Sequence, residues 1–387
     1  MNRHLYQKSI AIIQENQSKW GSYIASPEFP NYHYCWLRDG SFIANSMDCV
    51  GQHASAEAFF RWVDQAIQRY SAKVDEIERC GNEGSDIGRD AILHTRFTLD
   101  GYEGTIDETW GNFQIDGYGT WLWALAQHVR KTGNSSLLDE LSSSIKVTIR
   151  YLALTWKLPN YDCWEEHPEY MHPYSLACVY GGLNEIALLE KEGKLTLGDL
   201  DPAQLAAEIK EFVLQYGAVD GRFVKHIWPP RGDEPAKPVA KSAVDSSLLG
   251  MAYPFNLLDA FDPLMLATVE EIETKLVHTE GGVYRYKADV YYGGGQWILL
   301  AAWMGIYNLR LGKRDLAIKM MTWIEDQADA QGNLPEQVSQ HLLAPTQHNV
   351  WLEKWGPIAS PLLWSHAMYL ILYQELQESQ KHERAST

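Results

Sequence analysis

The chain has 387 residues, of which 45% are hydrophobic and 21% charged, and its formal net charge is −17. A surface that binds nucleic acid or an anionic membrane needs a basic stripe, and the sequence has none. The composition therefore excludes both of these partners and favours a small neutral or cationic partner. Residues 1–20 are polar and periodic, and no run of about 18 apolar residues follows, so we expect neither a signal segment nor a membrane span.

Apolar residues at helical spacing predict twelve helices of two alternating kinds. Half-polar helices with one apolar face are expected at 2–18, 53–71, 135–156, 201–216, 263–276 and 313–330. Helices rich in apolar and small residues, as though surrounded on all sides, are expected at 40–51, 118–132, 171–191, 245–252, 295–311 and 360–376. Strict alternation of this kind is typical of two concentric rings, so the sequence predicts an all-α fold, an (α/α)6 barrel of six inner and six outer helices.

The connections divide into two classes. Joins from an inner to the next outer helix are mostly tight and carry glycine, as at Gly51, Gly133 and Gly312. The opposite joins are much longer than the usual helix connection of about 2–8 residues; they span 19–39, 72–117, 157–170, 217–244, 277–294 and 331–359. All six long joins emerge at one end of such a barrel, with minor β-hairpin structure expected at 90–106, and this rim is where we expect a site.

No Ser/Gly/Pro-rich linker divides the chain, so we expect one barrel domain over 1–387. An extended helical array whose loops bind another protein is the alternative, but the joins are too irregular for a fixed repeat. The sequence does not indicate an oligomeric state. Five cysteines without CxxC spacing are typical of reduced thiols, which favours a cytoplasmic location.

The aromatic composition is skewed toward residues with a polar tip, with 15 Trp and 21 Tyr against 10 Phe. Such rings suit an amphipathic ligand such as a sugar, although they also fill helical cores. The rim loops carry several of them beside charged residues, at Trp36-Leu37-Arg38-Asp39, Trp110 to Gly117 and Asp162-Cys163-Trp164-Glu165-Glu166. The adjacent Arg38 and Asp39 offer donors and acceptors for neighbouring hydroxyls, or an N-cap and a surface charge.

The carboxylates of these loops predict a hydrolytic site. Glu165 and Glu166 alone would be read as a solvated turn, but two glutamates facing each other across a barrel mouth suit cleavage of a glycosidic bond, in which one carboxyl donates a proton and the other is ionised. Crowding of Asp162, Glu165 and Glu166 opposes ionisation of one of them. We take Glu165 as the proton donor because Trp164 beside it can supply an apolar wall.

Other motifs are less informative. Gly293-Gly294-Gly295 lacks the Lys and Ser/Thr of a phosphate loop, and the 13 histidines show no metal-binding spacing, so we expect no metal and no cofactor. The run from His167 to His172 either shapes the leaving-group side of a pocket or is a polar loop.

Several segments together resemble glycoside hydrolase family 15, the glucoamylase and glucodextranase family, whose catalytic domain is an (α/α)6 barrel. The similar segments, in order, are Tyr32 to Asp39, Trp110 to Gly119, Asp162 to Glu166, Tyr284-Arg285-Tyr286 with Trp297, Pro335-Glu336-Gln337 and Trp364 to Ala367. The resemblance implies hydrolysis of short α-glucosides from the non-reducing end with inversion, releasing β-glucose.

The resemblance also implies roles for individual residues. Glu165 matches the general acid and Glu336 the general base. The implied substrate-binding residues hold the terminal glucose, wall its pocket or bind hydroxyls near the scissile bond; they are Trp36, Arg38, Asp39, Trp110, Asp116, Asp162, Trp164, Glu166, Arg285 and Gln337.

The segment from His167 to Pro173 departs from the small turn that is usual in the family. We also expect no starch-binding module. A short member of this kind resembles enzymes that act on small isomaltose-like substrates, so we expect a preference for α-1,6 linkages. Maltose-type α-1,4 linkages and trehalose are the alternatives within the hydrolase class. Outside it stand a non-catalytic sugar-binding or sensing protein and a sugar epimerase that works through histidine proton transfer.

Overall fold

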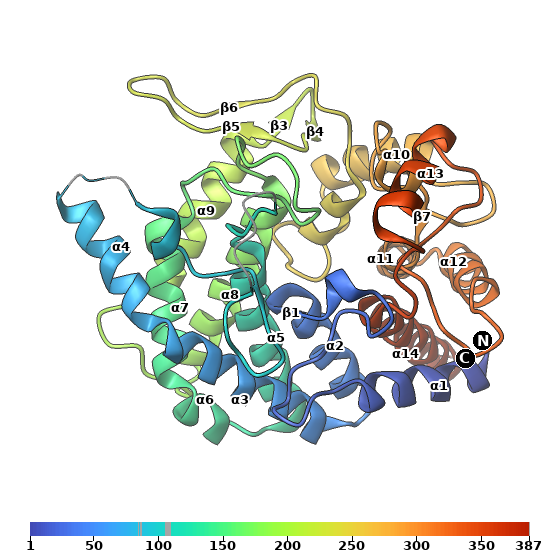
Figure 1. The fold of residues 1–387 in the computed structure, drawn as a ribbon, viewed down its shortest axis with the longest axis horizontal. Coiled ribbons are helices and arrows are strands. Elements are labelled where there is room, and N and C mark those ends of the chain that lie inside the picture. The colour runs from blue at the N-terminus through green and yellow to red at the C-terminus, as the bar shows by residue number, and fades with distance from the viewer. Residues whose placement is uncertain (84, 86, 105–109, 387) are drawn as a thin grey trace.

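The computed structural model describes residues 1–83, 85, 87–104 and 110–386. Five α-helices and one 3-10 helix surround the barrel axis, and Figure 1 shows several of them enclosed by the remaining helices. These inner elements are α2 (Leu37–Cys49), α5 (Asp116–Thr132), α8 (Pro173–Lys191), η3 (Ser246–Met251), α11 (Ile298–Arg310) and α14 (Leu363–Ser386). Each packs against the next, and α14 packs against α2, so the inner ring is closed.

Six helices form the outer ring, and each packs against at least one inner element. They are α1 (Arg3–Glu15), α3 (His53–Arg69), α7 (Ser142–Thr155), α9 (Pro202–Tyr216), α10 (Pro263–Leu276) and α12 (Arg314–Asp326). The predicted alternation of outer and inner helices is therefore confirmed, and with it the (α/α)6 barrel.

The inner and outer helices differ in what they bury. Almost every residue of α11 is buried, whereas α3 buries one face through Phe59, Trp62 and Val63 and leaves the other polar. Local signals set the helix ends. Asn2 caps α1 by accepting from the backbone N–H groups of His4 and Leu5, and Gly133 ends α5 in the left-handed conformation that glycine adopts at low cost.

The fourth inner element corrects an expectation. An α-helix is expected at 245–252, but the structure has a six-residue 3-10 helix there. Asp245 caps its start by accepting from the Ser247 N–H, and Pro254 cannot continue a helix because it has no N–H to donate. The chain from Ala252 to Asp262 then leaves the barrel axis without regular structure.

Three helices that periodicity did not separate lie at the edges of the barrel: α4 (Ser71–Glu83), α6 (Ser136–Glu140) and α13 (Pro345–Trp355). Helices α4 and α13 stand inside joins expected to be loops, and α6 is the first part of the helix expected at 135–156. Short 3-10 helices also occur at η1 (Pro30–Tyr32), η2 (Arg89–Ala91) and η4 (Tyr291–Gly293).

Short two-stranded pairs tie the long joins together, and all of them are antiparallel. The pairs are β1 (Cys35–Trp36) with β2 (Arg96–Phe97), β3 (Ala218–Val219) with β4 (Arg222–Phe223), β5 (Ile227–Trp228) with β6 (Lys237–Pro238), and β7 (Gln296–Trp297) with β8 (Gln337–Val338). In the hairpin expected at 90–106, a bridge joins Phe97 to Glu103 around a turn at Gly101, while β2 itself pairs with the first join; residues 105 and 106 lie outside the described ones.

Among the described residues, none of the helices combines the length and the apolar character that crossing a bilayer requires.

Candidate active site

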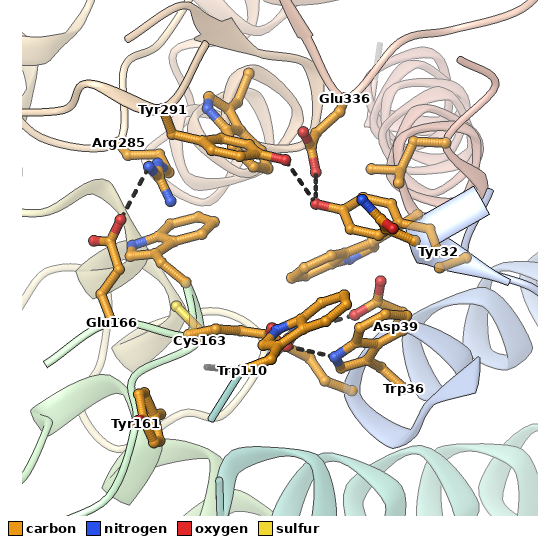
Figure 2. Close-up of a pocket in the computed structure, with 18 of the residues that line it drawn as sticks. Tyr32, Trp36, Asp39, Trp110, Tyr161, Cys163, Glu166, Arg285, Tyr291 and Glu336 are labelled. Atoms are coloured by element: carbon orange, nitrogen blue, oxygen red, sulfur yellow. Dashed lines mark hydrogen bonds and ion pairs between the residues drawn. The ribbon is translucent and has the colours of Figure 1, made fainter. Parts of the chain in front are cut away.

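A cavity of about 480 Å³ opens at the end of the barrel where the inner helices begin. Residues of five of the six long joins line it, and Figure 2 shows their side chains pointing into it from opposite walls. Its walls are largely aromatic, with Tyr32, Trp36, Trp110, Tyr161, Trp164, Tyr291, Trp297, Trp351, Trp355 and Trp364. Its charged groups are Arg38, Asp39, Glu165, Glu166, Arg285, Glu336 and Lys354.

Arg38 and Asp39 lie in the first turn of α2, which follows directly after strand β1. The Arg38 guanidinium donates to Asp39 at 3.1 Å, to the Gln114 amide oxygen at 2.9 Å and to Asp116 at 3.2 Å. Burial raises the pKa of Asp39 to about 6, although Arg38 opposes the rise. The pair is thus a fixed donor and acceptor on the cavity wall, which suits two neighbouring sugar hydroxyls.

The loop that carries Glu165 is held by Asp162. Its Oδ1 accepts hydrogen bonds of 2.9 Å from the N–H groups of Trp164 and Glu166, and the Asp162 carbonyl accepts from the Glu165 N–H. Glu165 has a φ of 64°, a conformation that non-glycine residues rarely adopt, so the surrounding contacts must hold it. This backbone conformation turns the Glu165 side chain into the cavity.

The Glu165 carboxylate accepts one hydrogen bond from the indole N–H of Trp36 and one from that of Trp110. The apolar wall expected from Trp164 is therefore supplied by two other tryptophans. The Trp164 indole instead packs against Trp297 and donates to Asp245 at 3.1 Å. Two donors and two flat rings fix the position of the carboxyl group.

Glu336 lies on the opposite wall, immediately before strand β8 (Figure 2). It is only 3% exposed, and its Oε1 accepts a hydrogen bond of 3.0 Å from the Tyr32 hydroxyl, which is itself bonded to the Tyr291 hydroxyl at 3.0 Å. Its Oε2 has no hydrogen-bond partner among the described residues. Burial raises the pKa of Glu336 to about 8, against the opposing effects of Tyr32 and Arg285.

Glu166 and Arg285 join two walls of the cavity. The guanidinium donates to Glu166 at 3.3 Å and forms two shorter bonds to Asp289, of 2.8 and 2.6 Å, while the Tyr286 hydroxyl donates to Glu166 at 2.5 Å. Burial alone would raise the pKa of Glu166, but Arg285 and Lys225 outweigh it and hold the pKa below its usual value. Glu166 is thus kept ionised as a hydrogen-bond acceptor at the cavity edge.

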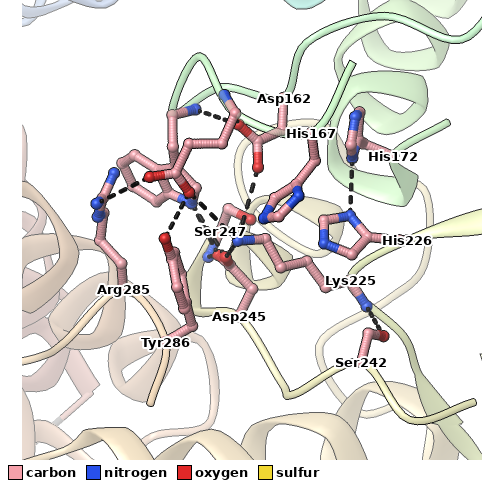
Figure 3. Close-up of polar contacts among 12 residues, drawn as sticks. Asp162, His167, His172, Lys225, His226, Ser242, Asp245, Ser247, Arg285 and Tyr286 are labelled. Carbon is pink, nitrogen blue, oxygen red and sulfur yellow. Dashed lines mark hydrogen bonds and ion pairs between the residues drawn. The ribbon is translucent and has the colours of Figure 1, made fainter. Parts of the chain in front are cut away.

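Lys225 holds the carboxylates at and behind the cavity wall, and the sequence did not reveal this role. Its ammonium group lies 3.0 Å from Asp245 and 3.6 Å from Asp162 (Figure 3). The Glu166 carboxylate is 3.9 Å away. Lys225 comes from the fourth join, where the bridge between Met171 and Ile227 ties that join to the loop after Glu166. Burial raises the pKa of Asp162 to about 7, and Lys225 opposes the rise. A single Lys in a long loop gives no sequence signal for this position.

The segment from His167 to Pro173 packs against the hairpin of strands β5 and β6 in the fourth join. His172 and His226 approach each other at 3.1 Å between their Nδ1 atoms, and the Tyr170 ring stacks on His226 at 4.7 Å. Burial lowers the pKa of His172 to about 3 and that of His226 to about 2, so both rings are neutral near pH 7. None of these side chains lines the cavity, so they support the Glu165 loop from behind.

Helix α13 supplies an unexpected part of the wall. It packs on η4 and places Trp351, Lys354 and Trp355 against the cavity. The Trp351 ring lies 5.0 Å from Tyr291 and 4.9 Å from Trp355. The i, i+4 spacing of the two tryptophans was the available signal, but no residue of α13 is fully buried, so its apolar pattern is too weak to predict a helix.

The structure brings together most of the residues that the sequence singled out. Glu165 and Glu336 line the same cavity, and so do Trp36, Arg38, Asp39, Trp110, Trp164, Glu166 and Arg285. Three others stand behind the wall: Asp116 holds Arg38, Asp162 holds the Glu165 loop, and the Gln337 amide oxygen accepts from the Gly295 N–H at 2.8 Å. Their roles in substrate binding remain predictions.

Two groups of side chains among the described residues have the spacing of metal ligands, Asp48 with His53 and His128, and His278 with Glu280 and His341. Neither group lines the cavity, and in the first the ligand atoms are already joined by hydrogen bonds of 2.8 and 2.9 Å. The polar groups that line the cavity include carboxyl groups, hydroxyl groups, guanidinium ions, indole N–H groups and the Lys354 ammonium group.

Comparison with known proteins identifies the class of this site. A family model described as glycosyl hydrolases family 15 matches residues 1–313. The isomaltose glucohydrolase of Kribbella flavida is 40% identical over 375 residues, which cover 96% of this chain and 92% of that protein.

Solved structures support the same family. A glycosidase variant in complex with glucose is 38% identical, with a TM-score of 0.88 over 97% of this chain and 99% of the other. A bacterial glucoamylase complexed with acarbose, 20% identical, shares the fold with a TM-score of 0.70 over 97% of this chain and 55% of the other. These matches favour a hydrolase over a sensing protein or an epimerase, and the chain belongs to glycosyl hydrolase family 15.

Proposed function

We propose that this glycoside hydrolase is an exo-acting α-glucosidase that works with inversion, releases β-glucose from the non-reducing end of short α-glucosides and prefers α-1,6 linkages. The observation that carries the proposal is that Glu165 and Glu336 line one aromatic cavity, and that Glu336 lies across it from Trp36 and Trp110, the two tryptophans that donate to Glu165 (Figure 2). Inverting hydrolysis needs such a pair, with carboxyls about 6.5–9.5 Å apart so that a water fits beside the sugar.

The proposed reaction is a single displacement. Glu165 gives its proton to the glycosidic oxygen as the bond to the anomeric carbon breaks. Glu336 takes a proton from a water molecule, whose oxygen forms the new bond to that carbon from the other face. The products are β-glucose and the shortened sugar. Glu165 leaves the cycle ionised and Glu336 protonated, and exchange with solvent restores both.

Binding of the terminal glucose is assigned to Arg38 and Asp39, with Trp36 and Trp110 as walls. Asp116 and Asp162 are proposed to contribute by fixing Arg38 and the Glu165 loop, and Gln337 by fixing the segment that carries Glu336. Glu166 and Arg285 lie at the cavity edge and are proposed to bind hydroxyls near the scissile bond.

One observation supports the α-1,6 linkage: the relative that is 40% identical is named for isomaltose. Another supports a small substrate: the cavity measures about 480 Å³, and Trp351, Lys354 and Trp355 of α13 stand against it. We therefore propose a neutral oligosaccharide of two or three units.

The test is an NMR time course on isomaltose, maltose, kojibiose, nigerose and trehalose. We expect the fastest cleavage for isomaltose, with β-glucose as the first anomer to appear. α-Glucose as the first product would refute inversion, and faster cleavage of maltose or trehalose would refute the linkage preference. The variants Glu165→Gln and Glu336→Gln should each lose activity, whereas Glu169→Gln, an exposed change in the same loop, should not.

A further inference from the structure

A second cavity, of about 560 Å³, lies at the opposite end of the barrel from the active-site cavity. Residues in the C-terminal halves of α2, α5, α8, α11 and α14 line it, among them Cys49, Lys131, Glu185, Arg310 and Glu375. We refer to it as the rear cavity. It shares no lining residue with the active-site cavity.

The rear cavity exists because the fourth inner element is short. Element η3 ends at Met251, where other inner helices continue for several more turns. The chain from Ala252 to Phe261 then bends away and lines the cavity with seven of its residues, so the space a longer helix would fill stays open.

Polar groups without partners face this space. Within the described part of the chain, the side-chain amides of Asn45, Gln127 and Asn256 make no hydrogen bond, although all three line the cavity. Asn45 is only 6% exposed and sits on α2 near the barrel axis. The amide nitrogen and oxygen atoms of these residues are open to the cavity, so the hydroxyl groups of a ligand can donate to them and accept from them in place of water.

The charges on the cavity wall are balanced. Three cations, Arg130, Lys131 and Arg310, face three acids, Glu185, Asp259 and Glu375. Arg130 is paired with Glu185 at 2.9 Å, and Arg310 with Glu375 at 3.0 Å. Cations in the last turn of a helix also complement the helix dipole, which accounts for their position without an anion. The wall therefore suits a neutral ligand better than a phosphate or a carboxylate.

Aromatic rings complete the wall. Trp123 is 4% exposed and lies deep in the barrel, and Phe261, 61% exposed, is a further lining residue. Flat rings beside amides and paired charges match the apolar faces and polar rim of a sugar. We propose that the rear cavity is a second binding site for a neutral mono- or disaccharide.

The fluorescence of Trp123 can report binding in the rear cavity. Trp123 packs against Phe42 at 5.7 Å, and Phe42 stacks on Trp364 at 5.4 Å. Trp364 lines the active-site cavity, so a single phenylalanine separates the two tryptophans. A ligand in the rear cavity would contact Trp123 and change its fluorescence.

The experiment is equilibrium dialysis with radiolabelled glucose and isomaltose on the full chain carrying Glu336→Gln, which removes turnover. We expect two moles of sugar per mole of chain at saturation. Adding Asn45→Leu and Gln127→Leu, which replace amides by apolar groups of similar size, should reduce this to one. The change Gln204→Ala, an amide on the outer helix α9, should leave two.

Several results would overturn the proposal. They are a single site in the parent chain, an unchanged stoichiometry in the double variant, and binding of inorganic phosphate in place of the sugars. If the double variant unfolds at a lower temperature than the parent, Gln127→Leu alone takes its place, because Gln127 is only partly buried. Loss of the second site, or binding there that is at least tenfold weaker, would support the proposal. Unchanged binding at the second site would refute it. Failure of the proposed catalytic function would appear instead as absent hydrolysis in the unmodified chain, with both sugar sites retained.

Discussion

The Tyr32 hydroxyl donates a hydrogen bond of 3.0 Å to Glu336. This bond connects the first of the six long joins of the barrel to the last. It is the one hydrogen bond to that carboxylate within the described part of the chain. The ionised form of Glu336 therefore depends on Tyr32 and, at longer range, on Arg285.

Replacing Tyr32 by Phe removes this donor and keeps the ring. A hydrogen bond to a charged group contributes about 1.5–3 kcal/mol, so we expect kcat/KM near pH 6 to fall by about 10- to 100-fold. The pKa of Glu336, about 8 with the donor present, should rise further and move the acidic limb of the pH profile to higher pH. Profiles of kcat/KM from pH 4 to 9 measure both effects. Tyr34→Phe is the control, since that hydroxyl has no hydrogen-bond partner among the described residues, and an unmoved acidic limb would contradict the prediction.

Glu336 should cost the protein stability as the pH rises. A carboxyl group whose pKa is about 8 in the folded chain and about 4.3 when unfolded holds its proton more tightly when folded, so stability falls between these two values. At pH 8, Glu336→Gln should therefore be more stable than the parent by on the order of 4–5 kcal/mol and should unfold at a higher denaturant concentration. At pH 4 the two proteins should unfold at the same denaturant concentration. The same variant should lose about 10²–10⁴-fold in kcat. Equal urea midpoints at pH 8 would refute the stability prediction.

Removing Lys225 should leave three neighbouring carboxylates without their shared cation. Lys225→Met is expected to destabilise the fold by about 3–5 kcal/mol at pH 8.5, because Asp162 and Asp245 are buried. The loss should shrink at pH 5, where Asp162, whose pKa is about 7 even beside Lys225, is protonated. Urea unfolding at both pH values tests this. Lys237→Met, an exposed change on the same hairpin, should have no effect, and an equal loss at both pH values would argue against the network.

Truncating Trp351 to Ala should weaken binding without slowing the chemical step. The ring stands at the cavity wall, away from Glu165 and Glu336 in sequence and carried by a separate helix. We expect KM for isomaltose to rise about 5- to 20-fold with kcat within about threefold. Steady-state kinetics on isomaltose measure both constants. Trp20→Ala, an exposed tryptophan remote from the cavity, is the control; a loss confined to kcat would contradict the role assigned to Trp351.

The barrel was predictable because its signal is repeated. Periodicity located five inner helices and six outer ones, since each inner helix is apolar on all sides and each outer one on a single face. The largest errors in the helix ends are at α14, which runs to Ser386 where 376 was expected, and at α7, which begins at Ser142 where 135 was expected. It did not reveal that η3 is a short 3-10 helix, because Leu248, Leu249 and Met251 are as apolar as a buried helix and only Pro254 marks the end. Whether 1–387 is a single folding unit stays a prediction.

The site was predictable where charge and aromatic residues cluster in sequence, as at Trp164, Glu165 and Glu166. The contacts that fix Glu165 were not, because they come from Trp36 and Trp110 on two other joins. Lys225 escaped for the same reason, since its carboxylate partners are at least 20 residues away and only the fold brings them together. Contacts between distant joins are set by the barrel and leave no mark on local sequence.

The closure of the inner ring also has a consequence for synthesis of the protein. Helix α14 packs between α2 and α11, and the Leu363 N–H donates to the Ala25 carbonyl at 3.0 Å. Tyr32 and Trp36 emerge early from a ribosome, but Glu336 and Trp364 emerge hundreds of residues later. Contacts so distant in sequence form slowly, and a nascent chain exposes apolar surface until they do. We therefore expect the ribosome-bound chain to lack sugar affinity and to recruit chaperones until α14 has left the exit tunnel.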